Sequence, residues 1–175
     1  MRSTGREVKI RLPRVGISAC LLGEPVRYDG RHKYAAQIVE TLSDVVSWVP
    51  LCPETEAGLG VPRPPVELIG SPGNFRVVSV ENPALDVTTT LLDFSQQKVQ
   101  NLGRINGFIL QSRSPSCGLK STPFRESGLL GAGVFACVLK HEFPELPVAE
   151  DVDLDSADAL DEFLQRVRRY DPNLR

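Results

Sequence analysis

The sequence predicts an α/β domain, specifically a Rossmann-like three-layer sandwich with a mainly parallel sheet. Short apolar segments with strand character alternate along the chain with segments whose apolar residues recur at helical spacing. This order is typical of parallel sheets covered by helices on both faces. The chain has 175 residues, 41% of them hydrophobic, which suits one well-buried core. We therefore expect an N-terminal extension over residues 1–14 and a single domain over residues 15–175.

The first elements form a strand, helix, strand unit. Residues 15–20 predict a short buried strand, residues 34–42 a helix in which Ile38 and Leu42 share a face, and residues 44–52 a second strand. A parallel crossover is the expected connection for such a unit. Residues 52–74 are rich in proline and glycine, which predicts a long loop rather than a helix. Loops of this length in compact domains are usually functional or disordered.

The second half continues the alternation. The pattern predicts a hairpin arm at residues 75–80, helices at 86–102 and 132–141, and strands at 106–111 and 146–149. The last helix is the clearest, because Asp155 and Ser156 are good N-cap candidates. Its apolar stripe consists of Leu160, Phe163, Leu164 and Val167.

Charge and hydropathy exclude two classes of partner. The chain carries 20 basic and 22 acidic residues, a formal net charge of -2, so it lacks the basic excess that non-specific nucleic-acid binding needs. The first residues lack the apolar core of a secretory signal, and no uncharged apolar run could span a bilayer. We expect a cytoplasmic protein with no nucleic-acid partner and no membrane partner.

Three of the four cysteines fall at the ends of predicted strands. Cys20 ends the first strand, Cys52 ends the second, and Cys117 lies a few residues past the third. Each alone could be a core residue, but a proline or glycine loop follows each one, and parallel sheets bind ligands at this carboxyl edge. Together they favour a shared site. Cys137 lies among apolar residues inside the predicted helix 132–141 and is expected to be a small buried side chain.

Three converging thiolates suggest a soft metal, either zinc or an iron–sulfur cluster. A structural zinc site normally needs four ligands, and only His32 or His141 could supply the fourth. Three thiolates are sufficient for a cluster with one open iron. Basic residues near the motifs could offset the negative charge of a cluster or simply lie on the solvated surface: Arg27, Lys33, Arg63, Arg113 and Lys120.

Four segments taken together resemble a small bacterial family, formerly a domain of unknown function, that includes 2-thiouracil desulfidases. The segments are SACLLGEPVRYDG with Lys33, CPETEAGLGVPRPPVE, SRSPSCG and GAGVFA, and the resemblance covers residues 15–153. It implies an oxygen-sensitive 4Fe-4S enzyme that replaces the sulfur of a small thiolated pyrimidine by oxygen without net redox chemistry. It also implies that Cys20, Cys52 and Cys117 hold the cluster and that the fourth iron binds the substrate sulfur.

Carboxylates and hydroxyls in these motif loops are the candidates for the chemistry. We expect Glu54 and Asp29 to act as acid and base toward the attacking water. Asp29 before a glycine is also typical of a turn, and Glu54 could cap a helix or pair with an arginine. The hydroxyls of Ser114 and Ser116 could hydrogen-bond the substrate or a cluster sulfide, or only form a turn.

Three further side chains are candidates for holding the substrate. Arg113 and Lys33 could steer a polar or anionic ring, and Tyr28 could stack on it or merely pack. The motif glycines are expected to serve backbone geometry instead: Gly118, Gly131 and Gly133.

Two positions depart from the family pattern. Val26 stands where the family usually has a second cysteine in its first motif, so any role of that thiol in relatives is lost here. Ala57 replaces a residue that is commonly glycine, which could narrow the conformations of the loop.

Two other functions stay open at this point. A non-catalytic metal or iron–sulfur protein, such as a carrier or a sensor, would use the same three thiols. A metal-free thiol enzyme would use Cys20 or Cys117 as nucleophile, in a loop whose amides could lower the thiol pKa. This chemistry lacks an evident partner, because His32 is the only histidine near a motif.

Overall fold

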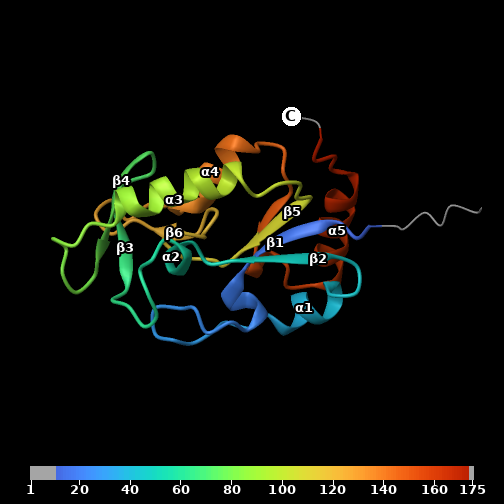
Figure 1. Cartoon of the computed structure of the whole chain (residues 1–175), viewed down its shortest axis with the longest axis horizontal. Coiled ribbons are helices and arrows are strands. Elements are labelled where there is room, and N and C mark those ends of the chain that lie inside the picture. Colours follow the sequence, from blue (N-terminus) through green and yellow to red (C-terminus); the bar gives the residue numbers. More distant parts are fainter. Residues whose placement is uncertain (1–10, 174–175) are drawn as a thin grey trace, which may run out of the picture.

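The computed structural model describes residues 11–173, whose centre is a sheet of four parallel strands (Figure 1). The strands stand in the order β2-β1-β5-β8, and every neighbouring pair is parallel. Their bounds are Arg14–Ser18 (β1), Ser47–Leu51 (β2), Gly107–Leu110 (β5) and Val148–Glu150 (β8). The predicted α/β class with a parallel sheet is confirmed. Residues 1–10 of the expected N-terminal extension lie outside the described residues, and its last residue, Arg14, already belongs to β1.

Helices cover both faces of the sheet, because side chains alternate along the strands. On one face, helices α1 (Ala36–Leu42) and α5 (Ala157–Arg169) pack against Val15, Ile17 and Ile109. On the other, helices α3 (Thr88–Gln100) and α4 (Val134–Glu142) flank a core that contains Phe108 and Leu110. The three-layer arrangement predicted from the sequence is therefore confirmed.

An antiparallel hairpin extends the fold at the end opposite α5 (Figure 1). It consists of β3 (Val66–Ser71) and β4 (Asn74–Ser79), and it packs with Leu91, Phe124 and Val134 in a separate apolar cluster. The predicted arm at residues 75–80 is thus confirmed. The short pair β6 (Thr122–Pro123) and β7 (Leu130–Gly131) lies beside this hairpin.

The prediction of an unbroken loop over residues 52–74 is wrong. This stretch contains the one-turn helix α2 (Pro53–Glu56) and the strand β3. Pro53 is compatible with α2 because it occupies the first turn, where a backbone N–H has no helical partner anyway. The strand is half-buried and borders glycine and proline, so its apolar pattern is short and easily missed.

Of three local predictions, one is confirmed and two are wrong. The first strand ends at Ser18, so Cys20 lies in the 3-10 helix η1 (Ala19–Leu22) and not at the strand end. The predicted cap of the last helix is confirmed, since the Oγ of Ser156 accepts a hydrogen bond from the amide of Ala159. Cys137 is exposed, contrary to expectation.

Among residues 11–173, no helix has the length and apolar character needed to cross a membrane.

Candidate metal centre and adjoining pocket

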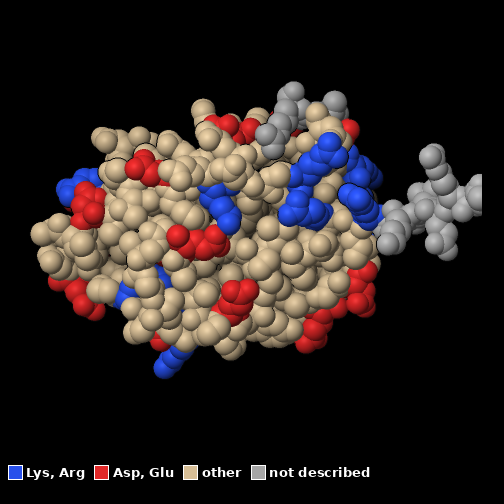
Figure 2. Space-filling model, in the orientation of Figure 1, with Lys and Arg blue, Asp and Glu red and all other residues tan. Residues whose placement is uncertain are grey.

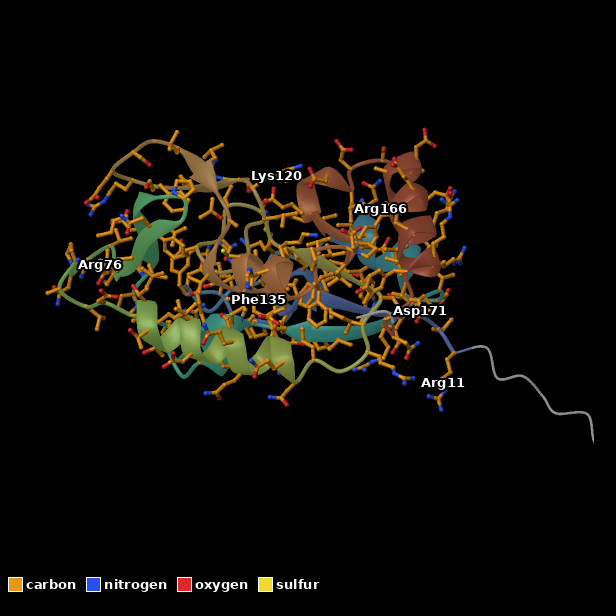
Figure 3. All side chains as sticks on the ribbon, turned by 90° about the horizontal axis from the view of Figure 1, so that it is seen from above. Arg11, Arg76, Lys120, Phe135, Arg166 and Asp171 are labelled. Carbon is orange, nitrogen blue, oxygen red and sulfur yellow. The ribbon has the colours of Figure 1, made fainter. Side chains whose placement is uncertain are left out.

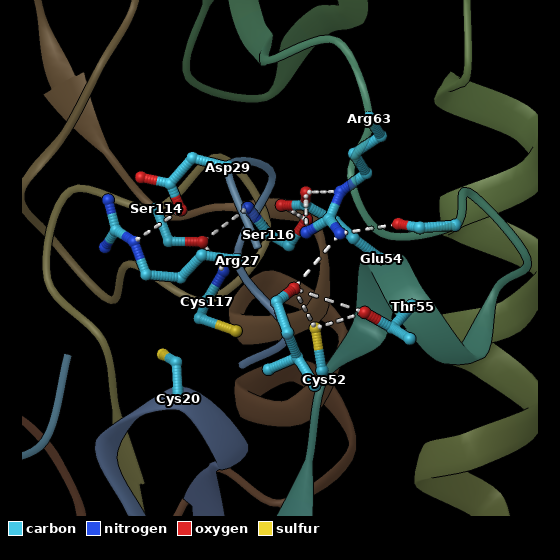
Figure 4. Close-up of polar contacts among 12 residues, drawn as sticks. Cys20, Arg27, Asp29, Cys52, Glu54, Thr55, Arg63, Ser114, Ser116 and Cys117 are labelled. Carbon is cyan, nitrogen blue, oxygen red and sulfur yellow. Dashed lines mark hydrogen bonds and ion pairs between the residues drawn. The ribbon is translucent and has the colours of Figure 1, made fainter. Parts of the chain in front are cut away.

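Three cysteines from separate elements converge beyond the carboxyl edge of the sheet. Cys20 lies in η1 after β1, Cys52 directly follows β2, and Cys117 lies in the loop after β5. Figure 4 shows their sulfur atoms facing a common space. All three line one small cavity of about 40 Å³, and none forms a disulfide. The three thiols that the sequence predicted to share one edge of the sheet therefore line one cavity, although Cys20 reaches it from a 3-10 turn.

The histidines proposed as a fourth ligand do not reach this cavity. His32 is exposed and accepts a hydrogen bond from the amide of Tyr34, and His141 is exposed on α4. Within residues 11–173, no three or more His, Cys, Asp or Glu side chains are grouped so as to hold a single metal ion. The three thiols thus lie around a shared space rather than around one ion-sized point.

The environment of the thiols disfavours a metal-free nucleophile. Burial, followed by the neighbouring Cys52, raises the pKa of Cys20 to about 12, and its Sγ donates to Oε1 of Gln111 at 3.0 Å. Burial also raises the pKa of Cys117 well above its ordinary value, against a lowering hydrogen bond with Ser18. A raised pKa favours the protonated thiol, and a protonated thiol reacts poorly.

Glu54 is held between two partners at the mouth of the cysteine cavity. Its Oε2 accepts from Nε and Nη2 of Arg63, both at 2.8 Å, and its Oε1 accepts from Oγ of the buried Ser116 at 2.9 Å. The side chains of Arg63 and Glu54 are only 5% and 11% exposed, so this ion pair is largely desolvated. The carboxylate is consequently an acceptor with a fixed orientation.

Arg63 also ties the first motif to the second (Figure 4). Its Nη1 donates to the carbonyls of Val26 at 3.0 Å and Gly60 at 2.8 Å. Thr55 donates to the same Val26 carbonyl at 3.3 Å and lies 3.2 Å from the sulfur of Cys52. Sequence reasoning counted Arg63 only as a nearby charge. It offered an arginine as an alternative partner of Glu54 but did not identify Arg63, and it missed the contact of Arg63 with Val26, which lies 37 positions away in the chain.

Ser114 organises the loop that carries Cys117. Its Oγ accepts from the amides of Ser116 and Cys117, at 3.3 and 3.0 Å. The carbonyls of the same loop accept hydrogen bonds from the first amides of α4. A Cβ at Gly133 would lie 2.6 Å from the Pro115 carbonyl oxygen, so only glycine permits this contact. The expected geometric role of Gly133 is confirmed.

A buried carboxylate that sequence reasoning missed fixes the chain after Cys117. Oε1 of Glu150, which is 0% exposed, accepts from the amides of Leu119, Lys120 and Ser121 and from the Ser121 hydroxyl. Within the described residues its other oxygen is buried without a hydrogen-bond partner. The one signal in the sequence is its place at the end of β8, on the same edge as the cysteines.

A larger pocket of about 440 Å³ adjoins the cysteine cavity. The two spaces share five lining residues, namely Arg27, Glu54, Arg63, Gln111 and Ser114. Of the residues that we expected to hold a substrate, Tyr28, Lys33 and Arg113 line the larger pocket, whereas Ser116 lines neither space and donates to Glu54 instead. It is therefore open to a small polar molecule that reaches toward the thiols.

The predicted substrate-binding residues differ in how firmly they are held. Lys33 pairs with Asp151 at 2.9 Å and donates to Oγ of Ser112 at 3.3 Å. Burial raises the pKa of Asp151, but the hydrogen bonds of Lys33 and Ser112 outweigh it and leave the pKa lowered. Arg113 has a φ of 62°, a left-handed conformation that is uncommon outside glycine and often found at functional sites. Tyr28 is 41% exposed at the rim.

Asp29 lies outside both spaces. It is exposed, accepts a hydrogen bond from the amide of Arg31, and lies 3.7 Å from Nε of Arg27. This is the turn arrangement that the sequence offered as its alternative.

The two family departures have different positions. Val26 lines the cysteine cavity itself. Ala57 has a φ of -74° at the end of α2, and the positive φ falls on the next residue, Gly58. Alanine therefore fits this turn without strain.

The comparisons agree with the motif-based expectation. The family model for 2-thiouracil desulfurase matches residues 15–151. The Bacillus subtilis (strain 168) protein YbbK, described as uncharacterized, is 33% identical over 133 residues, which cover 71% of this chain and 87% of that protein. The solved structure of the [4Fe-4S]-dependent thiouracil desulfidase TudS is similar with a TM-score of 0.67 and 29% identity, covering 90% of this chain and 99% of that one. The chain belongs to the 2-thiouracil desulfurase family.

Proposed function

We propose that this protein is a [4Fe-4S]-dependent desulfidase that replaces the sulfur of a thiolated pyrimidine, such as 2-thiouracil, by the oxygen of water and releases sulfide. One observation carries the proposal. The three family thiols line a single cavity, and that cavity shares Glu54 and Ser114 with a pocket large enough for a small heterocycle.

The donor set fits a cluster better than a single ion. Cysteine ligands of a cluster bind different irons, whereas the ligands of a zinc site converge on one point. Among residues 11–173 no such point exists, and neither histidine lines the cavity of Cys20, Cys52 and Cys117. Three thiolates would leave one iron without a protein ligand. When bound there, the cluster would supply a soft Lewis acid for a thiocarbonyl sulfur and so polarise the adjacent carbon.

The residues around the cavity would then position water and substrate. The Glu54 carboxylate is held in place at the junction of the two spaces. We therefore assign Glu54 the role of general base, which orients the attacking water and takes its proton. The Ser114 oxygen already accepts two amide hydrogen bonds, which leaves its O–H to donate to a polar atom of the substrate.

The wider pocket would bind the ring. Arg113 and Lys33 provide donors for exocyclic oxygen atoms, and Tyr28 provides an exposed aromatic face at the rim. The exchange balances as thiocarbonyl plus water giving carbonyl plus hydrogen sulfide, with no change of oxidation state. Asp29 has no contact with either space, so we give it no part in the exchange.

Anaerobic reconstitution and a sulfide-release assay test the proposal. Purified protein is expected to bind iron and sulfide in equal numbers, to show a broad visible absorption band, and to release sulfide from 2-thiouracil or 4-thiouracil. Changing Cys20, Cys52 or Cys117 to serine is expected to abolish both iron binding and activity. Cys137→Ser is the matched control, because this thiol is exposed and lines neither space.

Several results would contradict the proposal. Zinc without sulfide would indicate a metal-stabilised module. A stable cluster that releases no sulfide from either thiouracil would favour the carrier or sensor. Iron binding that survives in the three single variants would remove these thiols as ligands.

A further inference from the structure

A second pocket lies at the opposite edge of the sheet, where β1 and β5 begin. It has a volume of about 660 Å³, larger than the pocket next to the cysteines. Figure 2 shows basic side chains gathered at this end of the molecule, beside the point where the chain enters β1. We call it the amino-edge pocket, and its lining includes four arginines: Arg11, Arg14, Arg104 and Arg168. None of them belongs to the desulfidase motifs.

Little in the described structure neutralises these four charges. No acidic residue lines the pocket, and none of the four guanidinium groups forms an ion pair with another described residue. Asp171 lies at the same end of the molecule (Figure 3). Hydrogen bonds from Asn173 lower the pKa of Asp171, with a smaller contribution from Arg104, so this carboxylate offsets part of one charge. The residues that line the pocket therefore carry a net positive charge, which favours an anion.

The pocket floor is tied together by hydrogen bonds between separate elements. The guanidinium of Arg14 donates to the carbonyl of Arg104 at 3.0 Å, and the Arg14 amide donates to Oδ1 of Asn106 at 3.0 Å. The side-chain amide of Asn106 donates in turn to the carbonyl of Tyr170 at 3.2 Å. These contacts join β1, the loop before β5 and the end of α5. At least one arginine is therefore held in place before any ligand arrives, which lowers the entropic cost of binding.

Apart from the four arginines and Asn106, the lining residues are apolar. Leu12, which is 44% exposed, lines the pocket together with Pro13, Val45 and Pro172. Guanidinium groups bind phosphate oxygens in bidentate fashion, and apolar side chains are suited to contact a heterocyclic ring. The volume also lies in the range of small-molecule sites, roughly 300–1,000 Å³.

We propose that the amino-edge pocket binds a nucleoside di- or triphosphate, with the phosphates on the arginines and the base against the apolar wall. A longer nucleic acid fits less well, because the chain as a whole has a net charge of -2 and the basic residues converge on one pocket. The site is separate from the cysteine cavity, so it does not depend on the proposed desulfidase activity.

Isothermal titration of the full chain, purified anaerobically, tests this proposal. ADP, ATP and pyrophosphate are the probes, and adenosine without phosphate is the comparison compound. We expect ADP and ATP to bind in the micromolar range and more weakly at higher salt. Arg104→Ala and Arg168→Ala are each expected to weaken binding at least about tenfold, because each removes charged hydrogen bonds to phosphate. Arg166→Ala is the matched control on the same helix, since this exposed arginine does not line the pocket.

Four outcomes of the titrations, and a fifth from a competition experiment, would each overturn the proposal. These are the absence of ADP binding at millimolar concentration, equal binding of adenosine and ADP, and equal weakening by Arg166→Ala and Arg168→Ala. The fourth is binding that is lost in Arg113→Ala but kept in Arg168→Ala, which would place the nucleotide beside the cysteines. A single-stranded RNA oligonucleotide serves as competitor, and tighter binding of RNA than of ATP would also contradict the proposal. Circular dichroism confirms that the surface variants fold.

Discussion

The buried pair of Arg63 and Glu54 makes the sharpest stability prediction. Arg63→Met keeps an unbranched apolar stem but removes the guanidinium, which leaves the Glu54 carboxylate without its cation. The pair is only 5% and 11% exposed, so the remaining charge is largely cut off from water. Breaking a buried pair in this way costs about 3–5 kcal/mol. For a chain of this size, that loss corresponds to a fall in Tm on the order of 10 °C.

A surface pair of similar length provides the control. Lys98 pairs at 2.7 Å with Glu56, which lies in α2 like Glu54, but the side chains of this pair are 33% and 37% exposed. Lys98→Met is therefore expected to cost less than about 1 kcal/mol, because solvent screens the pair. Urea unfolding of both variants, at equal metal content, compares the two pairs directly.

A double variant separates two effects of Arg63→Met, namely the lost attraction between the two side chains and the cost of leaving the Glu54 carboxylate buried without a partner cation. Combining Arg63→Met with Glu54→Gln removes the uncompensated carboxylate, so the double variant is expected to recover about 0.5–3 kcal/mol of the single-variant loss. The reasoning fails if Arg63→Met is no more destabilising than Lys98→Met. It also fails if adding Glu54→Gln to Arg63→Met destabilises the protein as much as Glu54→Gln does alone. Arg63→Lys keeps a charge but loses the two donors that hold Oε2, so sulfide release should fall more than stability does.

Three further predictions rest on single positions. Asp86 has a pKa of about 2, lowered first by the hydroxyl and amide of Thr88 and then by Arg76. The contribution of the Asp86 carboxylate to stability is fully present above its ordinary pKa and is lost as pH falls through 2. Asp86→Asn should therefore lower Tm by about 2–4 °C at pH 7 and leave Tm unchanged at the lowest pH. An equal fall in Tm at every pH would refute this. Gly133→Ala should cost about 1–3 kcal/mol in urea unfolding, because its Cβ would meet backbone atoms within 2.7 Å; unchanged stability would show that the loop yields. Val26→Cys should leave the iron stoichiometry unchanged, whereas additional iron would show that three ligands are not the full set.

Elements with strong periodicity were predictable from the sequence, and those that depend on context were not. The α5 stripe and its Ser156 cap follow directly from residue type and spacing. The prediction for Cys137 failed although the helix was right. Phe135 and Leu139 are four residues apart and share the buried face, whereas Cys137 is midway between them and points to the opposite, exposed side.

The sequence predicted the edge of the sheet at which the candidate site lies, but not the contacts between its residues. Parallel strands deliver their following residues to one side of a sheet, so the convergence of the three thiols needed only strand order and cysteine positions. The clamp of Arg63 on Glu54 and the loop held by Glu150 depend on how residues distant in sequence pack together. The sequence offered an arginine as one alternative partner of Glu54, but no local pattern identifies Arg63 as that arginine.

The position of Val26 explains how this chain can lack a family cysteine without losing the shape of the site. Val26 is among the residues that line the cysteine cavity, and the loop is fixed through its backbone, because the Val26 carbonyl accepts from Arg63 and Thr55. Neither hydrogen bond depends on which side chain stands at this position. Exchanging cysteine for valine therefore changes the chemistry of the cavity wall while the loop keeps its path. Position 26 offers no thiol, so Cys20, Cys52 and Cys117 are the thiols left to bind the cluster that we propose, with one iron open to the substrate sulfur.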